Sequence, residues 1–190
     1  GCIKMASLLI KNGFVYDPIN GINGQKMDIA IENGKIVESV DEKTAKIIDA
    51  SGMTVMAGGV DLHSHIAGAE VNMARTLRPE DHYKDFERKT ANTRSGVGRT
   101  VPSVYTTGYR YSRMGYTTVN NPSMACFKAK HAHEEMNEMP GLEKATYPLL
   151  GDWWFSLDAL QRGNLEECAQ YIAWMMDAIK GYAIKIVNPG

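Results

Sequence analysis

Two histidines separated by one residue, His63 and His65, end an apolar run that begins at Gly58. Side chains alternate between the two faces of a β-strand, so residues two apart project in the same direction. Imidazole nitrogens suit zinc and related divalent ions, and the pair could hold one ion from the end of a strand. A catalytic zinc needs about three protein ligands, so the pair predicts part of a metal site. Two surface histidines with no metal are the alternative.

Lys185 is the single charged residue in the apolar run 182–187. An isolated buried ammonium is costly, and burial lowers the pKa of a lysine and frees its amine for chemistry. Three interpretations compete. The lysine reaches a carboxylate or lies at a sheet edge, or it forms a Schiff base, or CO2 carboxylates it. Carboxylation would give an anionic oxygen ligand that is able to bridge two metal ions.

The elements that position these residues alternate between strands and helices from residue 58 onward. The expected strands are 60–65, 116–120, 146–155 and 182–187, and the expected helices are 80–90, 102–114, 124–136 and 164–180. Such alternation indicates an α/β fold with a parallel sheet covered by helices. Four β/α units fit the first half of a (β/α)8 TIM-like barrel, whose active site collects at the carboxyl ends of the strands. A doubly wound sheet is the runner-up, although the chain lacks a glycine-rich phosphate loop.

Residues 7–57 have the pattern of a small β-sandwich module. Asn33-Gly34 lies between β-prone runs and predicts a tight hairpin, and a turn is also expected at Asn12-Gly13. We expect 7–57 to be the N-terminal part of a composite β domain, with an independent small β domain as the alternative. We expect 58–190 to be the first half of a metal-binding barrel that is truncated at its C-terminus, in a longer protein.

Composition and charge exclude several classes of partner. The chain has 190 residues with 21 Lys+Arg against 22 Asp+Glu, for a net charge of -1. This balance gives no reason to expect nucleic acid or an anionic membrane as a partner. The apolar runs are shorter than a membrane span.

Cys2, Cys126 and Cys168 are widely spaced, which is typical of reduced thiols in a cytoplasmic protein.

His131 and His133 form a second pair with the same spacing, but they fall in an expected helix. Residues two apart on a helix diverge by about 200°, so these side chains cannot readily share a metal ion. We expect them to be surface or supporting groups.

Several segments together resemble a known family. They are 10–16, 56–65, 65–69, 78–81, 107–111, 115–119, 131–135 and 181–189. The chain resembles the amidohydrolase superfamily and, within it, the A subunits of formylmethanofuran dehydrogenases. The A subunits of bacterial formyltransferase/hydrolase complexes are the nearest alternative, and the resemblance covers residues 7–190.

The resemblance implies a site with two zinc ions, in which His63 and His65 bind one metal and a carboxylated Lys185 bridges both. It implies that formate is condensed with methanofuran, or that the formamide is hydrolysed, in CO2 reduction and methanogenesis. Partner subunits of the complex would carry a molybdenum or tungsten pterin and iron–sulfur clusters. The family's two further histidines and catalytic aspartate would lie beyond residue 190, so this fragment alone is expected to be inactive. The alternatives are a generic cyclic-amide hydrolase and a non-catalytic scaffold subunit.

Overall fold

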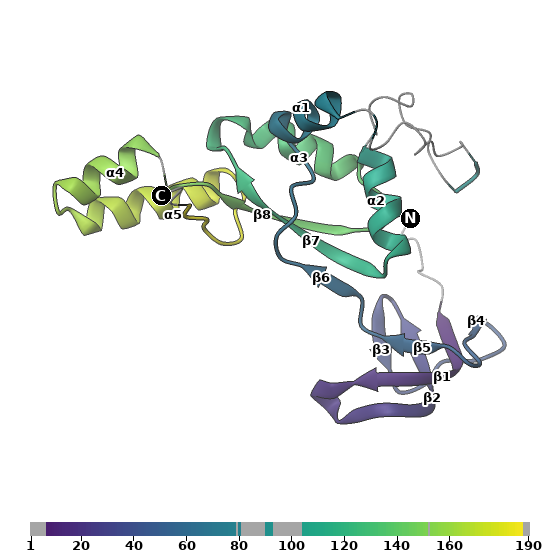
Figure 1. Ribbon diagram of the computed structural model, residues 1–190. Coiled ribbons are helices and arrows are strands. Elements are labelled where there is room, and N and C mark those ends of the chain that lie inside the picture. The colour runs from purple at the N-terminus through teal and green to yellow at the C-terminus, as the bar shows by residue number, and fades with distance from the viewer. Residues whose placement is uncertain (1–6, 79, 81–89, 93–103, 152, 188–190) are drawn as a thin grey trace. The chain divides into compact units, whose positions relative to one another are not determined.

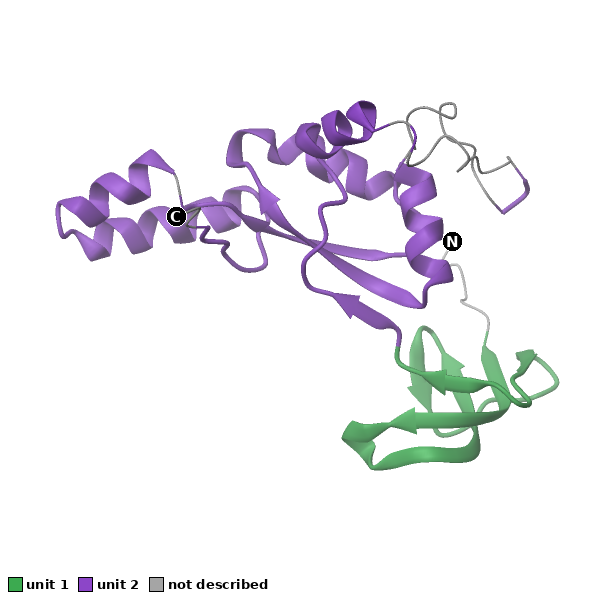
Figure 2. Cartoon of the chain, in the orientation of Figure 1, with its two compact units in different colours: residues 1–57 green, residues 58–190 purple. Residues whose placement is uncertain are grey.

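The computed structural model describes residues 7–78, 80, 90–92, 104–151 and 153–187. The chain divides into two compact units, Gly1–Ala57 and Gly58–Gly190 (Figure 2). Most of the helix expected at 80–90 lies outside the described residues.

The first unit contains one five-stranded mixed sheet (Figure 1). Its strands are β1 (Leu8–Asp17), β2 (Ile22–Glu32), β3 (Lys35–Val37), β4 (Lys46–Asp49) and β5 (Thr54–Met56), and a 3-10 turn, η1 (Pro18–Asn20), joins β1 to β2. The order is β3-β2-β1-β4, and β5 also pairs with β1. β1 is antiparallel to β2 and parallel to β4 and β5. A sandwich needs two facing sheets. The described strands of this unit form a single sheet, so they do not make the predicted sandwich.

The hairpin predicted at Asn33-Gly34 is confirmed, since both residues have positive φ angles, 50° and 76°, and they join the antiparallel pair β2 and β3. The turn predicted at Asn12-Gly13 is wrong. β1 continues through this point with a shift of register against β2, and Asn12 takes a φ of 64°. The backbone N–H of Asn12 donates to Asp28 Oδ1 at 2.8 Å, so a side chain on the neighbouring strand replaces a ladder hydrogen bond. The result is a bulge within one strand.

The second unit contains a parallel sheet in the order β6-β7-β8. Its strands are β6 (Gly59–Asp61), β7 (Tyr116–Met124) and β8 (Glu143–Pro148), and its helices are α1 (Ala69–Leu77), α2 (Val104–Arg113), α3 (Ala129–Glu138), α4 (Trp154–Gln161) and α5 (Leu165–Ala178), with a 3-10 turn, η3 (Cys126–Lys128), before α3. Strands and helices alternate and the strands are parallel, as predicted. The sheet is open in the described part of the chain, so it is not a closed barrel.

Several elements differ from the prediction. Residue 124, expected to open a helix, instead ends β7, and α3 begins at Ala129. β7 continues past the expected end at Asn120 to Met124, and its register against β8 shifts between Asn121 and Met124, where Pro122 has no N–H to donate to the ladder. The strand expected at 146–155 is also wrong in part, because β8 ends at Pro148 and α4 begins at Trp154. Helix α1 was not anticipated.

The last helix, α5, begins as its sequence predicts. The Asn164 side chain accepts a hydrogen bond from the backbone N–H of Glu167 at 3.1 Å, and its amide donates to Glu167 Oε2 at 2.8 Å. These bonds satisfy one of the free donors of the first turn. The side chains of Cys168 and Met175 then face the interior.

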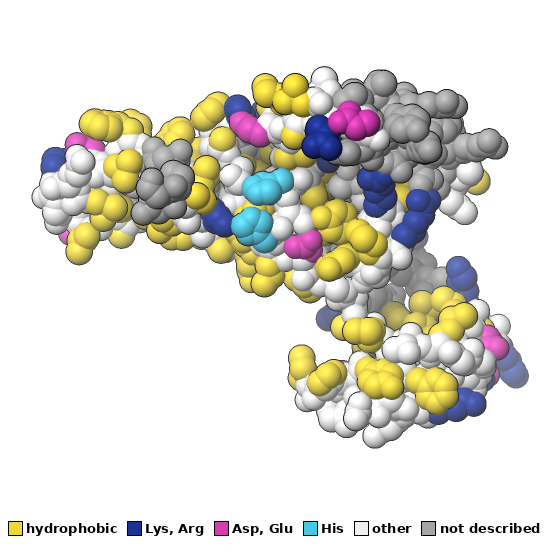
Figure 3. All heavy atoms as spheres, in the orientation of Figure 1, with side chains coloured by type: hydrophobic (Ala, Val, Ile, Leu, Met, Phe, Trp, Pro, Cys, Tyr) yellow, Lys and Arg dark blue, Asp and Glu magenta, His cyan; other side chains and the backbone are white. Residues whose placement is uncertain are grey.

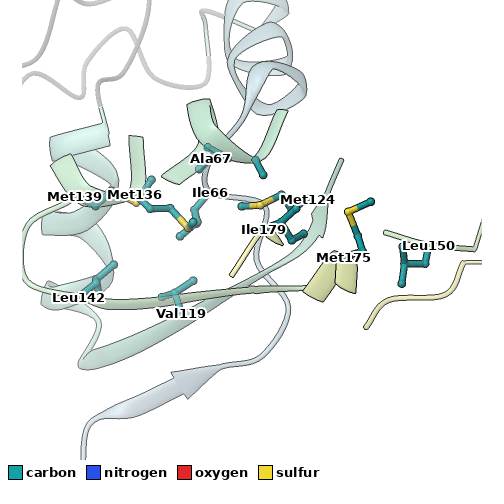
Figure 4. Packing of buried hydrophobic residues seen from close by; sticks show 12 residues of the cluster. Ile66, Ala67, Val119, Met124, Met136, Met139, Leu142, Leu150, Met175 and Ile179 are labelled. Atoms are coloured by element: carbon teal, nitrogen blue, oxygen red, sulfur yellow. The ribbon is translucent and has the colours of Figure 1, made fainter. Parts of the chain in front are cut away.

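The main core of the second unit lies between the sheet and its helices (Figure 4). Val119 of β7 is fully buried, and the same core includes Met124 of β7, Met136 of α3, Met139 at the end of α3 and Met175 of α5. Methionine fills irregular gaps because its side chain is unbranched and flexible. The core also includes Ile66 and Ala67, and so it holds the segment directly after the histidine pair.

Candidate metal centre

His63 and His65 follow β6 instead of lying on it. The strand pairs with β7 only as far as Asp61 opposite Val119, so the prediction that a strand carries both histidines is wrong. The rings nevertheless lie close together, with centroids 5.5 Å apart and planes at 80°. Both side chains are exposed, and histidine side chains lie next to each other on the face shown in Figure 3.

The Asp61 carboxylate shapes the turn that follows β6. The Ser64 hydroxyl donates to Asp61 Oδ2, and the backbone N–H of His63 donates to Asp61 Oδ1 at 3.0 Å. The Ser64 hydrogen bond and then the His63 N–H hold the pKa of Asp61 below its usual range, because both favour the ionised carboxylate. This side chain therefore competes with the strand ladder for the backbone and ends the strand.

Lys185 approaches the same place from the other end of the chain. Its N–H donates to Pro148 O at 2.9 Å, and its carbonyl accepts from Leu150 N at 3.0 Å. These bonds place it parallel to the end of β8, as a bridge opposite Leu149. The predicted strand at 182–187 is reduced to this bridge, and the Lys185 side chain is half-buried.

The three residues proposed from the sequence as metal ligands converge. Lys185 Nζ lies 3.4 Å from Nδ1 of His63, across 122 positions of sequence. Partial desolvation of the His65 ring, followed by repulsion from His63 and Lys185, lowers the pKa of His65 below its ordinary value although the side chain remains exposed. The neutral imidazole is the form that binds metal, so this environment favours the metal-binding state of His65.

The lowered pKa predicts a pH dependence. In the metal-free protein, unfolded His65 takes up a proton near pH 6.5 before folded His65 does, so the free energy of unfolding should fall as the pH drops through about 6.5. Lys185→Met should raise the pKa of His65 by removing a nearby positive charge, whereas Lys180→Met, at an exposed lysine, should not. Imidazole NMR titration measures the pKa of His65 in the wild type and in both variants. A wild-type His65 pKa at or above about 6.5 would contradict the expectation.

The donor set fits a metal ion only in part. Within the ranges that the structure describes, no three His, Cys, Asp or Glu side chains cluster as a metal site. Two neutral imidazoles suit zinc, whereas a lysine ammonium repels a cation. Lys185 would therefore join the ligands only after its charge is removed, which carboxylation by CO2 would achieve.

The second histidine pair has separate partners. His131 and His133 lie on α3, where His131 Nε2 meets Glu135 Oε1 at 2.8 Å and His133 Nε2 lies 2.7 Å from Ile179 O. The expectation that they do not share a metal agrees with these contacts.

Two residues at the site were missed from the sequence. The Tyr111 hydroxyl lies 2.6 Å from Ser64 Oγ, and Asn120 O accepts the backbone N–H of Ser64 at 3.0 Å. The strand predicted at 116–120 ends at Asn120, so the sequence could have placed this residue at a strand end beside the histidine segment. No local pattern marks Tyr111, because its contact with Ser64 spans 47 positions.

None of the helices that the structure describes is long and apolar enough to cross a membrane.

Comparison with known proteins places this chain in a family. The profile described as Amidohydrolase family matches residues 46–190. Protein FwdA of Methanocaldococcus jannaschii is 55% identical over 182 residues, which cover 96% of this chain and 32% of that protein. The Fhc A subunit of the formyltransferase/hydrolase complex of Methylorubrum extorquens is 32% identical over 182 residues, which cover 95% of this chain and 32% of that protein.

The structural comparison agrees. The crystal structure of the formyltransferase/hydrolase complex FhcABCD from Methylorubrum extorquens, in complex with methylofuran, has a chain that matches with a TM-score of 0.83 and 31% identity. The match covers 96% of this chain and 33% of that one. The chain thus spans about a third of the length of the curated relatives it matches. It is a homologue of FwdA, aligned with part of that protein, and it belongs to the amidohydrolase family.

Proposed function

We propose that this chain supplies His63, His65 and Lys185 to the metal centre of an amidohydrolase-type subunit that forms or hydrolyses a formamide. The observation that carries the proposal is the 3.4 Å contact between Lys185 Nζ and His63 Nδ1. A histidine pair alone is weak support for a metal centre. Here a lysine from a segment far along the chain, which pairs beside the end of β8, reaches the same pair in a member of this family. One metal centre that uses all three residues is the simplest explanation.

Each residue has a distinct role in this proposal. His63 and His65 bind metal through neutral imidazole nitrogens, and the lowered pKa of His65 favours that form. The neutral amine of Lys185 attacks CO2, so that an N–C bond forms and one proton is released. The resulting carbamate would offer two anionic oxygens as metal ligands beside His63 and His65. A divalent metal pair held by these residues would supply Lewis-acid polarisation of the substrate carbonyl.

The relatives suggest which substrates to propose. One relative belongs to a formyltransferase/hydrolase complex, and a structure of that complex contains methylofuran. We therefore propose that formate and the amine of methanofuran, or of a related furan carrier, condense to a formamide and water, or that the reverse hydrolysis occurs. Formate would come from partner subunits that hold a molybdenum or tungsten pterin and iron–sulfur clusters.

Metal analysis and turnover of the full-length subunit in its complex test this proposal. We expect two zinc ions per chain, and we expect formate to be released from the formylated furan amine but not from hydantoin or dihydroorotate. Turnover of the cyclic amides without partner subunits would instead favour a general cyclic-amide hydrolase. Full activity of the metal-free protein would rule the proposal out, and absence of any turnover would favour a scaffold.

A further inference from the structure

The Tyr111 hydroxyl reaches the segment that carries the two histidines. Tyr111 lies on α2, and its hydroxyl oxygen is 2.6 Å from Ser64 Oγ. Ser64 has a single hydroxyl hydrogen, which it donates to Asp61 Oδ2. Tyr111 is therefore the donor in its contact with Ser64. The hydrogen bonds run from Tyr111 to Ser64 to Asp61, whose other oxygen accepts the N–H of His63 at 3.0 Å.

The tyrosine ring is itself held in place. It packs against the core and meets the ring of Tyr116 edge-on, with centroids 5.6 Å apart and planes at 70°. A ring fixed on two sides presents its hydroxyl in a defined position, so the Ser64 contact costs little further side-chain entropy.

The sheet holds the backbone of the same segment. Asn120, which is buried, accepts the N–H of Ser64 at 3.0 Å, and its side-chain amide donates to the carbonyl of Asp61 at 3.3 Å. These bonds fix the main chain on the side of β7, while Tyr111 holds the serine side chain from α2. Ser64 lies between the two histidines in sequence, so a shift of Ser64 moves both of them.

We infer that Tyr111 is a positioning residue for the histidine pair, and that it acts through Ser64 and Asp61. The inference rests on the proposed metal-binding role of His63 and His65. Groups that orient metal ligands typically change metal affinity by 10- to 100-fold when they are removed. Tyr111 would thereby set how well the two imidazoles converge on one ion, without contacting the ion or the substrate.

Tyr111→Phe keeps the ring and removes only the donor. In the full-length subunit we expect it to weaken zinc affinity about 10-fold and to shift the visible absorption of the Co2+-substituted protein, with little change in Tm. Tyr105→Phe is the matched control, because it also removes a tyrosine hydroxyl from α2. That hydroxyl donates to Glu138 Oε2 at 2.9 Å. The control should leave zinc affinity and the Co2+ spectrum unchanged.

A double-mutant cycle tests the route through Ser64. Ser64→Ala should weaken zinc binding by itself, and adding Tyr111→Phe to it should have little further effect. Additive effects would overturn the route. If the wild type binds no zinc, the proposed function fails. If the wild type binds zinc and Tyr111→Phe behaves as Tyr105→Phe does, only the positioning role fails.

Discussion

Replacing Lys185 with alanine is expected to lower turnover of the formylated furan amine about a thousand-fold, equivalent to about 4 kcal/mol of transition-state stabilisation. The amine lies 3.4 Å from His63 Nδ1, and no other side chain in the run 182–187 could supply a carbamate. Without the carbamate, bound zinc should fall from two ions to at most one per chain. Steady-state kinetics and metal analysis of the full-length subunit measure the two effects together.

Two further lysine variants separate charge from carboxylation. Lys185→Arg keeps a positive charge of similar reach, but a guanidinium stays protonated and cannot react with CO2. We expect it to be as inactive as Lys185→Ala. Lys180→Ala is the control, because Lys180 is exposed and pairs only loosely with Asp177, at 3.6 Å. Activity retained by Lys185→Arg would show that Lys185 acts through its charge and not through a carbamate.

Replacing His63 with alanine is expected to remove both metal and activity. His63 lies against His65 and Lys185, so its loss takes one imidazole from the pair and also the contact that orients the lysine. A catalytic zinc has about three protein ligands, and the loss of one leaves the ion weakly held. We expect less than about a hundredth of wild-type turnover, measured with metal content on the same sample.

His131→Ala is the matched control for this variant. It removes an exposed histidine of the same spacing from α3, where the ring pairs with Glu135. We expect full metal content and nearly full activity. Metal retained by His63→Ala, or lost by His131→Ala, would mean that the wrong histidine pair has been assigned to the site.

Much of the second unit could be predicted from the sequence because its signals are local. The cap of α5 at Asn164 and the end of α2 before Gly115, whose φ is 86°, are set by neighbouring residues. The parallel order of the strands follows from their alternation with helices. Lys185 could be singled out because one charge in an apolar run requires an explanation.

The wrong predictions occur where a side-chain hydrogen bond or a packing contact overrides the pattern that the sequence shows. The run around His63 alternates as a strand would, but the Asp61 carboxylate captures the N–H of His63 and ends the ladder. The sequence predicts one strand over 146–155, although β8 ends at Pro148 and α4 begins at Trp154, because periodicity does not distinguish a short buried strand from a helix start. The contact of Tyr111 with Ser64 depends on how α2 packs, which no local pattern specifies.

Anomalous diffraction at the zinc edge, on crystals of the full-length subunit, tests the central claim most directly. The account predicts a zinc peak about 2.0–2.1 Å from an imidazole nitrogen of both His63 and His65. It also predicts a second zinc peak, with density for a carbamate that extends from Lys185 Nζ between the two ions. A zinc site formed without these three residues, or a free Lys185 amine beside fully occupied metals, would contradict it.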